Sequence, residues 1–181
     1  MFSTGTILFL LVILIFDITQ ISSKFEFTNI KCSSKDKNFV EFEYCYIKSV
    51  NRSYKYISMK TRLRSLPINE ATARLQILRR FRSFMPITMN VTVEICKFMT
   101  DKKSIFNPML ELFNDATKKY TNLNHTCPYD HDIVIDKLPT HYLNQHFTNV
   151  LPLPPGEYAF HSIWLIKGIE RYTFMIYGTI S

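Results

Sequence analysis

Alternation of apolar and polar residues with a period of two runs through most of this chain, and it restricts those segments to half-buried β-strands. In segment 87–95, for example, Ile87, Val91 and Ile95 share one face, whereas Thr88 and Glu94 share the other. The same alternation predicts strands over six further segments: 25–31, 38–50, 54–64, 71–82, 157–167 and 171–180. Strands with one apolar face form antiparallel sheets, and two such sheets pack against each other through their apolar faces. The strand pattern predicts an all-β fold, either a sandwich or a barrel, and we favour a two-sheet antiparallel β-sandwich of the immunoglobulin-like type.

Residues 108–120 break this rule and predict one short helix. Apolar side chains recur there at helical spacing: Met109, Leu112, Phe113, Ala116 and Tyr120. Asn107 suits the N-cap, and Pro108 suits the first helical position. We expect this helix to pack against an edge or the mouth of the sandwich.

Residues 7–16 form an uninterrupted apolar run near the amino terminus. The run is too short for a membrane span, which needs roughly 20 apolar residues. It fits the apolar region of a secretory signal peptide, and Ser22 and Ser23 supply small side chains for cleavage. We therefore expect a signal peptide over 1–23 and a single secreted, extracellular domain over 24–181; an uncleaved anchor is the alternative.

Four cysteines follow the expected leader. An even number in an exported chain predicts two disulfides, and three pairings are possible. We favour Cys32–Cys45 with Cys96–Cys127, because each of these pairs closes a local segment.

Three N-x-Ser/Thr sequons agree with export and predict glycans on Asn51, Asn90 and Asn124. Asn90 falls on the polar face of its predicted strand, as a glycan requires. Together the leader, the paired cysteines and the sequons predict a secreted glycoprotein.

The chain carries a net charge of +7, which favours anionic partners such as acidic lipids or sulfated glycans. Nucleic acid is not expected as the partner of an exported protein. The candidate residues for an anionic partner lie on two predicted strands, which we expect to be neighbours and to form one arginine face: Arg62, Arg64, Arg74, Arg80 and Arg82. A solvated strand face explains the same charges.

The densest polar cluster lies between His125 and Asp132 and offers imidazole, thiol and carboxylate groups of the kind that bind zinc. We favour a structural interpretation, since a cysteine in a disulfide cannot bind metal and no second cysteine lies close in sequence. Motifs of activated nucleophiles are absent from the sequence. The expectation is a protein that is not an enzyme and that needs no metal or cofactor.

Aromatic and methionine side chains on the predicted strands and helix either fill a core or line a cavity for an apolar ligand, and periodicity alone leaves both open. The candidates for such a cavity are Phe42, Tyr44, Phe81, Met89, Phe113, Phe160, Trp164 and Phe174.

Four stretches resemble an insect family of secreted proteins known as domain of unknown function 1091. They are residues 45–53, 107–113, 124–132 (Asn-His-Thr-Cys-Pro-Tyr-Asp-His-Asp) and 153–158 (Leu-Pro-Pro-Gly-Glu-Tyr). The resemblance covers about 25–181. This family is distantly similar to the ML-type lipid-recognition domains, which are secreted, disulfide-bonded β-sandwiches with a lipid cavity between the sheets. Some related insect proteins are implicated in contact chemosensation.

The resemblance implies a non-enzymatic binder of a hydrophobic or lipid-like molecule, held between the sheets for carriage or chemosensory presentation. The alternative hypothesis is a recognition module with a solid core, which binds a cell-surface receptor or an anionic glycan through the arginine face. No integral membrane span is expected once the leader is removed.

Overall fold

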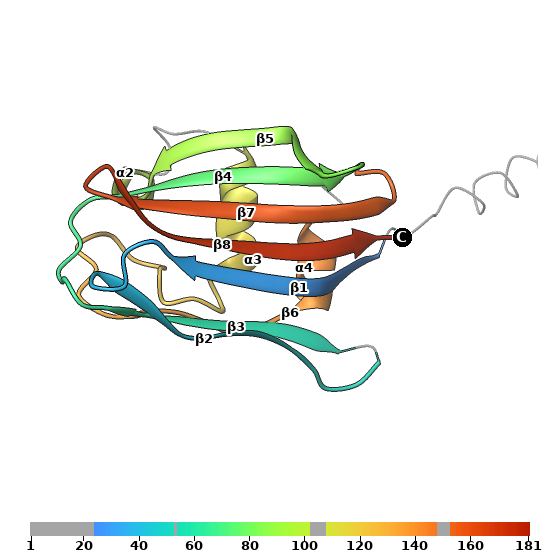
Figure 1. Cartoon of the computed structure of the whole chain (residues 1–181), viewed down its shortest axis with the longest axis horizontal. Helices are drawn as coiled ribbons and strands as arrows, with labels where there is room; N and C mark the ends of the chain where they lie inside the picture. Colours follow the sequence, from blue (N-terminus) through green and yellow to red (C-terminus); the bar gives the residue numbers. More distant parts are fainter. Residues whose placement is uncertain (1–23, 53, 102–107, 148–152) are drawn as a thin grey trace, which may run out of the picture.

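A computed structural model of the chain describes residues 24–52, 54–101, 108–147 and 153–181 (Figure 1). The leader predicted over 1–23 lies outside these residues. Two antiparallel sheets dominate the described part. The strands of the larger sheet, in spatial order, are β1 (Phe25–Ser34), β8 (Ile169–Ile180), β7 (Gly156–Ile166), β4 (Ala71–Arg80) and β5 (Phe84–Glu94). The smaller sheet contains β2 (Val40–Ser49), β3 (Lys55–Leu63) and β6 (Ile133–Pro139).

The two-sheet, antiparallel, all-β fold predicted from the sequence is confirmed. Each segment that alternates in the sequence forms a strand. One strand, β6, was not predicted. Its alternation covers only Ile133 and Ile135, and Lys137 then adopts a φ of 49°, so that the next buried residue is Leu138.

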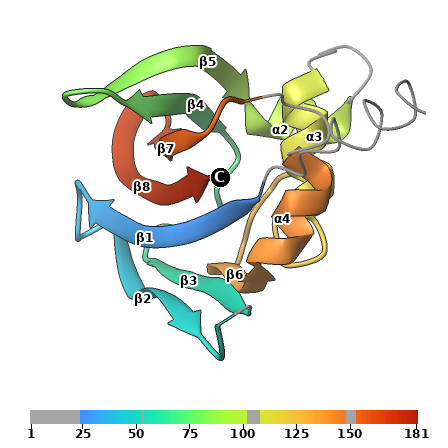
Figure 2. The same ribbon diagram turned by 90° about the vertical axis from the view of Figure 1, so that its right-hand side faces the viewer.

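The helix predicted over 108–120 is present as α3 (Pro108–Thr117). The prediction of a single helix was wrong, because α2 (Ile95–Thr100) and α4 (Thr140–Phe147) are also present. These helices have 6 and 8 residues, which is too short for a helical period to stand out. Figure 2 shows the three helices together on one side of the larger sheet. Asn107, the predicted N-cap of α3, is outside the described residues.

A β-bulge in β2 changes which side chains of this strand face the core. The pairing of β2 with β3 shifts between Phe42 and Tyr44. Val40 is buried before the shift, whereas Cys45 and Ile47 pack against the core after it. Such a bulge adds one residue and so reverses the alternation. Tyr44 and Tyr46 therefore do not continue the inward face that starts at Val40, contrary to the sequence prediction.

Both disulfides pair as predicted, and each joins two different parts of the fold. Cys32–Cys45 links β1 of the larger sheet to β2 of the smaller sheet. Cys96–Cys127 links α2 to the loop that precedes β6. The first bridge ties the sheets to each other, and the second holds the helical side of the molecule.

The smaller sheet packs against the β1 and β8 part of the larger sheet. Phe42 meets the ring of Tyr172 edge-on, with 5.9 Å between ring centroids, and Met59 lies 3.6 Å from the sulfur of Cys32. Tyr172 is 1% exposed, and burial raises the pKa of its phenol far above the ordinary value. The side chains around Tyr172 form a filled core, and a more polar, open hollow lined by residues such as Asn29, Ser49 and Lys55 lies beside it between β1 and the edge of the smaller sheet.

Removal of either disulfide is expected to destabilise the protein by about 3 kcal/mol, since each bridge restricts the unfolded chain. The loops closed span 13 and 31 residues, so Cys96→Ala/Cys127→Ala should cost somewhat more than Cys32→Ala/Cys45→Ala. Urea unfolding followed by the fluorescence of Trp164, the one tryptophan in the chain, measures both. A loss below about 1 kcal/mol for both double variants would contradict the role assigned to the bridges.

Candidate ligand cavity

A cavity of about 250 Å³ lies over the inner face of the larger sheet. Its floor is made by alternate residues of the three middle strands, which are neighbours in the sheet register. The floor includes Ala73, Leu75 and Ile77 of β4, Phe160 and Trp164 of β7, and Phe174 of β8. The period of two in these strands thus places one apolar face toward the cavity.

The helices form the opposite wall. Leu110 and Phe113 of α3, Phe98 of α2 and Leu143 of α4 all line the cavity. The ring of Phe113 stacks on that of Phe160, with 4.5 Å between centroids and 29° between planes. This stack connects α3 directly to the central strand of the sheet, so the helix is a wall of the cavity rather than a cover at its edge.

The cavity is not where the sequence interpretation placed it. It was expected between the two sheets, but among the described lining residues Ile135 of β6 alone belongs to a strand of the smaller sheet. The reason is that the smaller sheet packs near β1 and β8, whereas α2 and α3 cover β4 and β7, and α4 lies beside β1 and β6 (Figure 2). The hollow part of the interior is therefore between sheet and helices.

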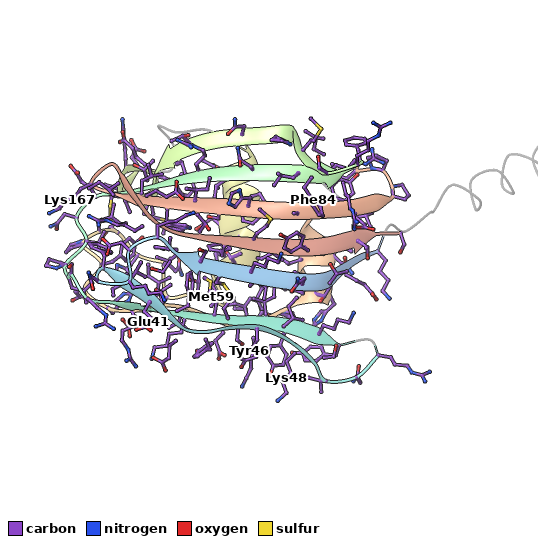
Figure 3. The ribbon with its side chains drawn as sticks, viewed as in Figure 1. Glu41, Tyr46, Lys48, Met59, Phe84 and Lys167 are labelled. Atoms are coloured by element: carbon purple, nitrogen blue, oxygen red, sulfur yellow. A yellow bond between two sulfur atoms is a disulfide. The ribbon has the colours of Figure 1, made fainter. Side chains whose placement is uncertain are left out.

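Four of the predicted cavity residues line the cavity: Phe113, Phe160, Trp164 and Phe174. Three others do not. Phe42 packs in the filled core, Tyr44 contacts Tyr46 at 5.8 Å between centroids, and Phe81 is 61% exposed beyond the end of β4. Figure 3 shows Glu41, Tyr46 and Lys48 on the outer side of the smaller sheet. Met89 lies in β5, but its side chain is not among those described.

The sequence interpretation missed several lining residues that come from short or terminal elements. Phe25 and Phe27 of β1 and Met99 of α2 line the cavity. Gly178 of β8 leaves space for the ring of Phe25, because a Cβ there would collide with that ring. The alternation in β1 could have identified Phe25 and Phe27 as inward-facing residues. Helix α2 is too short to show a periodic pattern that would have identified Met99.

The walls are mainly apolar, with Asn114, Thr117 and Thr121 as polar residues on the side opposite the floor, and no lining residue among those described carries a charge. Polar side chains interrupt the floor at Ser162 and Trp164. Within the described structure, Ser162 Oγ and Trp164 Nε1 are buried and have no hydrogen-bond partner. The indole of Trp164 stacks on Tyr172 at 5.6 Å with 9° between the ring planes, so this pair separates the cavity from the filled core.

The Cys-Pro-Tyr segment of the polar cluster has a structural role. Tyr129 is 1% exposed, and its hydroxyl donates to the carbonyl oxygen of His125 at 3.0 Å. Its backbone pairs with Ile68 as an isolated β-bridge. Burial raises the pKa of Tyr129 to about 12, which keeps the phenol protonated as the donor at neutral pH.

The other groups of this cluster also have structural partners. Cys127 is in its disulfide, and the Nε2 atoms of His125 and His131 lie 2.8 Å apart in a shared hydrogen bond. An Asp132 carboxylate oxygen accepts the backbone N–H of Leu63 at 2.9 Å. In the part of the chain that is described, no group of three or more His, Cys, Asp or Glu side chains is arranged to hold a metal.

The 153–158 motif secures the start of β7. The hydroxyl of Tyr158 donates to the carbonyl oxygen of Pro154 at 2.6 Å, and Arg79 donates to that of Pro155 at 3.1 Å. Gly156 has a φ of 155°, and a Cβ there would lie 3.3 Å from Nε of Arg79. Glycine is suited to this position because of both the backbone angle and the close approach.

The five candidate arginines do not form one face. Arg62 lies on β3 of the smaller sheet and Arg64 directly follows that strand, and Glu43 and Glu41 pair with them at 3.1 and 2.8 Å. Arg74, Arg80 and Arg82 lie on or beside β4 of the larger sheet, and Arg80 pairs with Glu157 at 2.7 Å. The expectation that β3 and β4 are neighbours was wrong, because these consecutive strands belong to different sheets.

Residues 73–160 match the family model described as "Protein of unknown function (DUF1091)". This segment belongs to that family. The match runs from β4 to β7 and so includes the helices, the Cys-Pro-Tyr loop and part of the cavity floor. A search of curated proteins found no match. Within the described residues, no helix is long and apolar enough to cross a membrane.

Tyr129→Phe is expected to lower the free energy of unfolding by about 1 kcal/mol, because it removes the hydrogen bond from the buried Tyr129 hydroxyl to the carbonyl of His125. Tyr46→Phe is the matched control, since Tyr46 is 42% exposed and should change stability by less than about 0.5 kcal/mol. Chemical denaturation of both variants checks the difference. Equal stability of the two variants would show that the Tyr129 hydroxyl does not hold the loop.

Proposed function

We propose that this protein is a secreted, non-catalytic binding protein that carries a small hydrophobic or lipid-like molecule in the cavity between the larger sheet and the helices. The observation that carries the proposal is the apolar cavity of about 250 Å³. For comparison, an engineered cavity of roughly 150 Å³ with Leu, Ile and Phe walls stays dry and binds benzene. The present cavity has room for a larger molecule, such as a short acyl chain.

The energetics of packing support an occupant. Protein interiors are normally close-packed, and empty volume costs about 24 cal/mol per Å³ in a set of core variants. On that scale, 250 Å³ of empty space costs on the order of 5 kcal/mol. An apolar ligand regains much of this through burial of its own surface and through contact with the walls.

Secretion is the second part of the proposal. Two disulfides fit an oxidising compartment, and Asn51, Asn90 and Asn124 are all exposed. The resemblance to secreted insect proteins supports extracellular carriage, including presentation of the ligand to a chemosensory receptor.

The alternative, a recognition module that binds a receptor or glycan through an arginine face, has less support. The arginines lie on two sheets, and three of them already pair with glutamates. A module of this kind would also have no use for a cavity.

Leu75→Trp should lower the affinity for an apolar ligand at least about tenfold, because the larger side chain fills the cavity from its floor. The probe is N-phenyl-1-naphthylamine, whose fluorescence rises on transfer to an apolar site. Arg74→Trp, on the exposed face of the same strand, is the control and should bind as the wild type does. Equal binding by Leu75→Trp and the wild type, with both folded by circular dichroism, would place the ligand elsewhere.

Expression of the full chain in cultured eukaryotic cells should deliver the protein to the medium with glycans on Asn51, Asn90 and Asn124. Enzymatic deglycosylation should lower its mass, and Asn→Gln at each site should remove one step of that shift, as measured by mass spectrometry. Retention inside the cells without glycans would contradict secretion.

A further inference from the structure

Two polar side chains interrupt the otherwise apolar floor of the cavity, and both lie on its central strand. Ser162 and Trp164 are two residues apart on β7, so they point to the same face of the sheet. In the register, Ser162 lies between Leu75 and Phe174, and Trp164 lies between Ala73 and Tyr172. Ser162 is 0% exposed and Trp164 is 7% exposed.

Neither polar group has a partner in the described part of the protein. Ser162 Oγ and Trp164 Nε1 are shielded from solvent and make no hydrogen bond. Buried polar groups are nearly always paired, since an unpaired one forfeits its bonds to water without replacement. Two such groups on the floor of one cavity indicate that the ligand supplies the missing partner.

The chemistry of the two groups restricts that partner. An indole N–H only donates, so Trp164 requires an acceptor atom. A serine hydroxyl donates or accepts, and rotation about the Cα–Cβ bond lets Oγ turn toward a ligand that lies over Leu75 and Phe174. A single oxygen atom on the ligand meets both requirements.

The charge of the ligand is restricted as well. Among the described residues, the cavity lining contains no Lys, Arg or His that would compensate a carboxylate or phosphate. Burial of an unpaired ion is strongly unfavourable, whereas burial of a neutral oxygen that is hydrogen-bonded is not.

We propose that the cavity selects an apolar molecule with one neutral oxygen, as in an alcohol or ketone, and that Ser162 and Trp164 hold this oxygen against the floor. The inference rests on the proposed carrier function and adds the chemical class of the ligand. A bare hydrocarbon leaves both polar groups unpaired, and an ionised fatty acid brings a charge that the walls do not balance.

The experiment compares four probes of equal chain length, octane, 1-octanol, 2-octanone and octanoate, as competitors of N-phenyl-1-naphthylamine at neutral pH on the disulfide-intact protein. Ser162→Ala should reduce the affinity ratio of 1-octanol to octane by about three- to tenfold, and Trp164→Phe should do the same for 2-octanone. Octane is the reference in each variant, so that a change in cavity volume caused by the substitution is divided out of the ratio. Octanoate should compete least.

Ile176→Val is the control, because it changes an apolar lining residue and should leave all of these ratios unaltered. Unchanged ratios in both Ser162→Ala and Trp164→Phe would overturn the inference, and so would octanoate binding as tightly as 1-octanol. In either case, binding of octane to the wild type would still support the carrier function. If no probe and no N-phenyl-1-naphthylamine bound to the wild type, the carrier function itself would fail.

Discussion

The unequal width of the two sheets governs the rest of this structure. Five strands present an apolar inner face, and three strands cannot cover it. The smaller sheet packs on the β1 and β8 side, where Phe42 meets Tyr172. The remaining inner face of β4, β5 and β7 must be covered by something else, since an exposed apolar sheet face of this size is unstable in water. Helices α2 and α3 supply that cover, and α4 closes the side between β1 and β6 (Figure 2).

Cover by short helices differs from cover by a second sheet. A sheet face interdigitates with another sheet along its whole length. The helices α2, α3 and α4 have 6, 10 and 8 residues and touch the larger sheet through a few large side chains, such as Phe113 on Phe160. The space between these contacts is the cavity. It follows from the architecture and does not require any one special residue.

The way in which the larger sheet is covered explains which features of the structure could be predicted from the sequence. The strands were predictable because a period of two depends on burial of one face, and each such segment became a strand. The disulfide pairing was predictable from spacing. The bulge between Phe42 and Tyr44 was not, because one inserted residue reverses the face without any change in composition. The position of the cavity could not be predicted either. Helices α2 and α4 are too short to show a helical period, and the part of the sheet that these helices meet depends on pairing between strands that are distant in sequence.

The motifs that identify the family do not mark the cavity. Tyr129 holds the loop before β6, and Tyr158 with Gly156 holds the entry to β7, each through a hydroxyl that donates to a backbone carbonyl. Such contacts need one residue type at one position, so they leave a recognisable pattern in the sequence. The apolar walls of a cavity accept many combinations of Leu, Ile, Val and Phe, so they leave no recognisable pattern in the sequence. In a protein of this kind, family motifs therefore mark residues that hold the backbone in place, and not residues that line the cavity.

The filled half and the hollow half of the interior depend on each other. Empty volume and unpaired polar groups at Ser162 and Trp164 both lower stability, and the helical wall alone has few contacts to offset this loss. Cys96–Cys127 fixes α2 to the loop of Tyr129, and Cys32–Cys45 fixes the filled core between the sheets. The stack of Trp164 on Tyr172 connects the two halves, with one ring in the cavity wall and the other in the core. A tightly held core on one side of this stack allows the other side to remain open for a ligand.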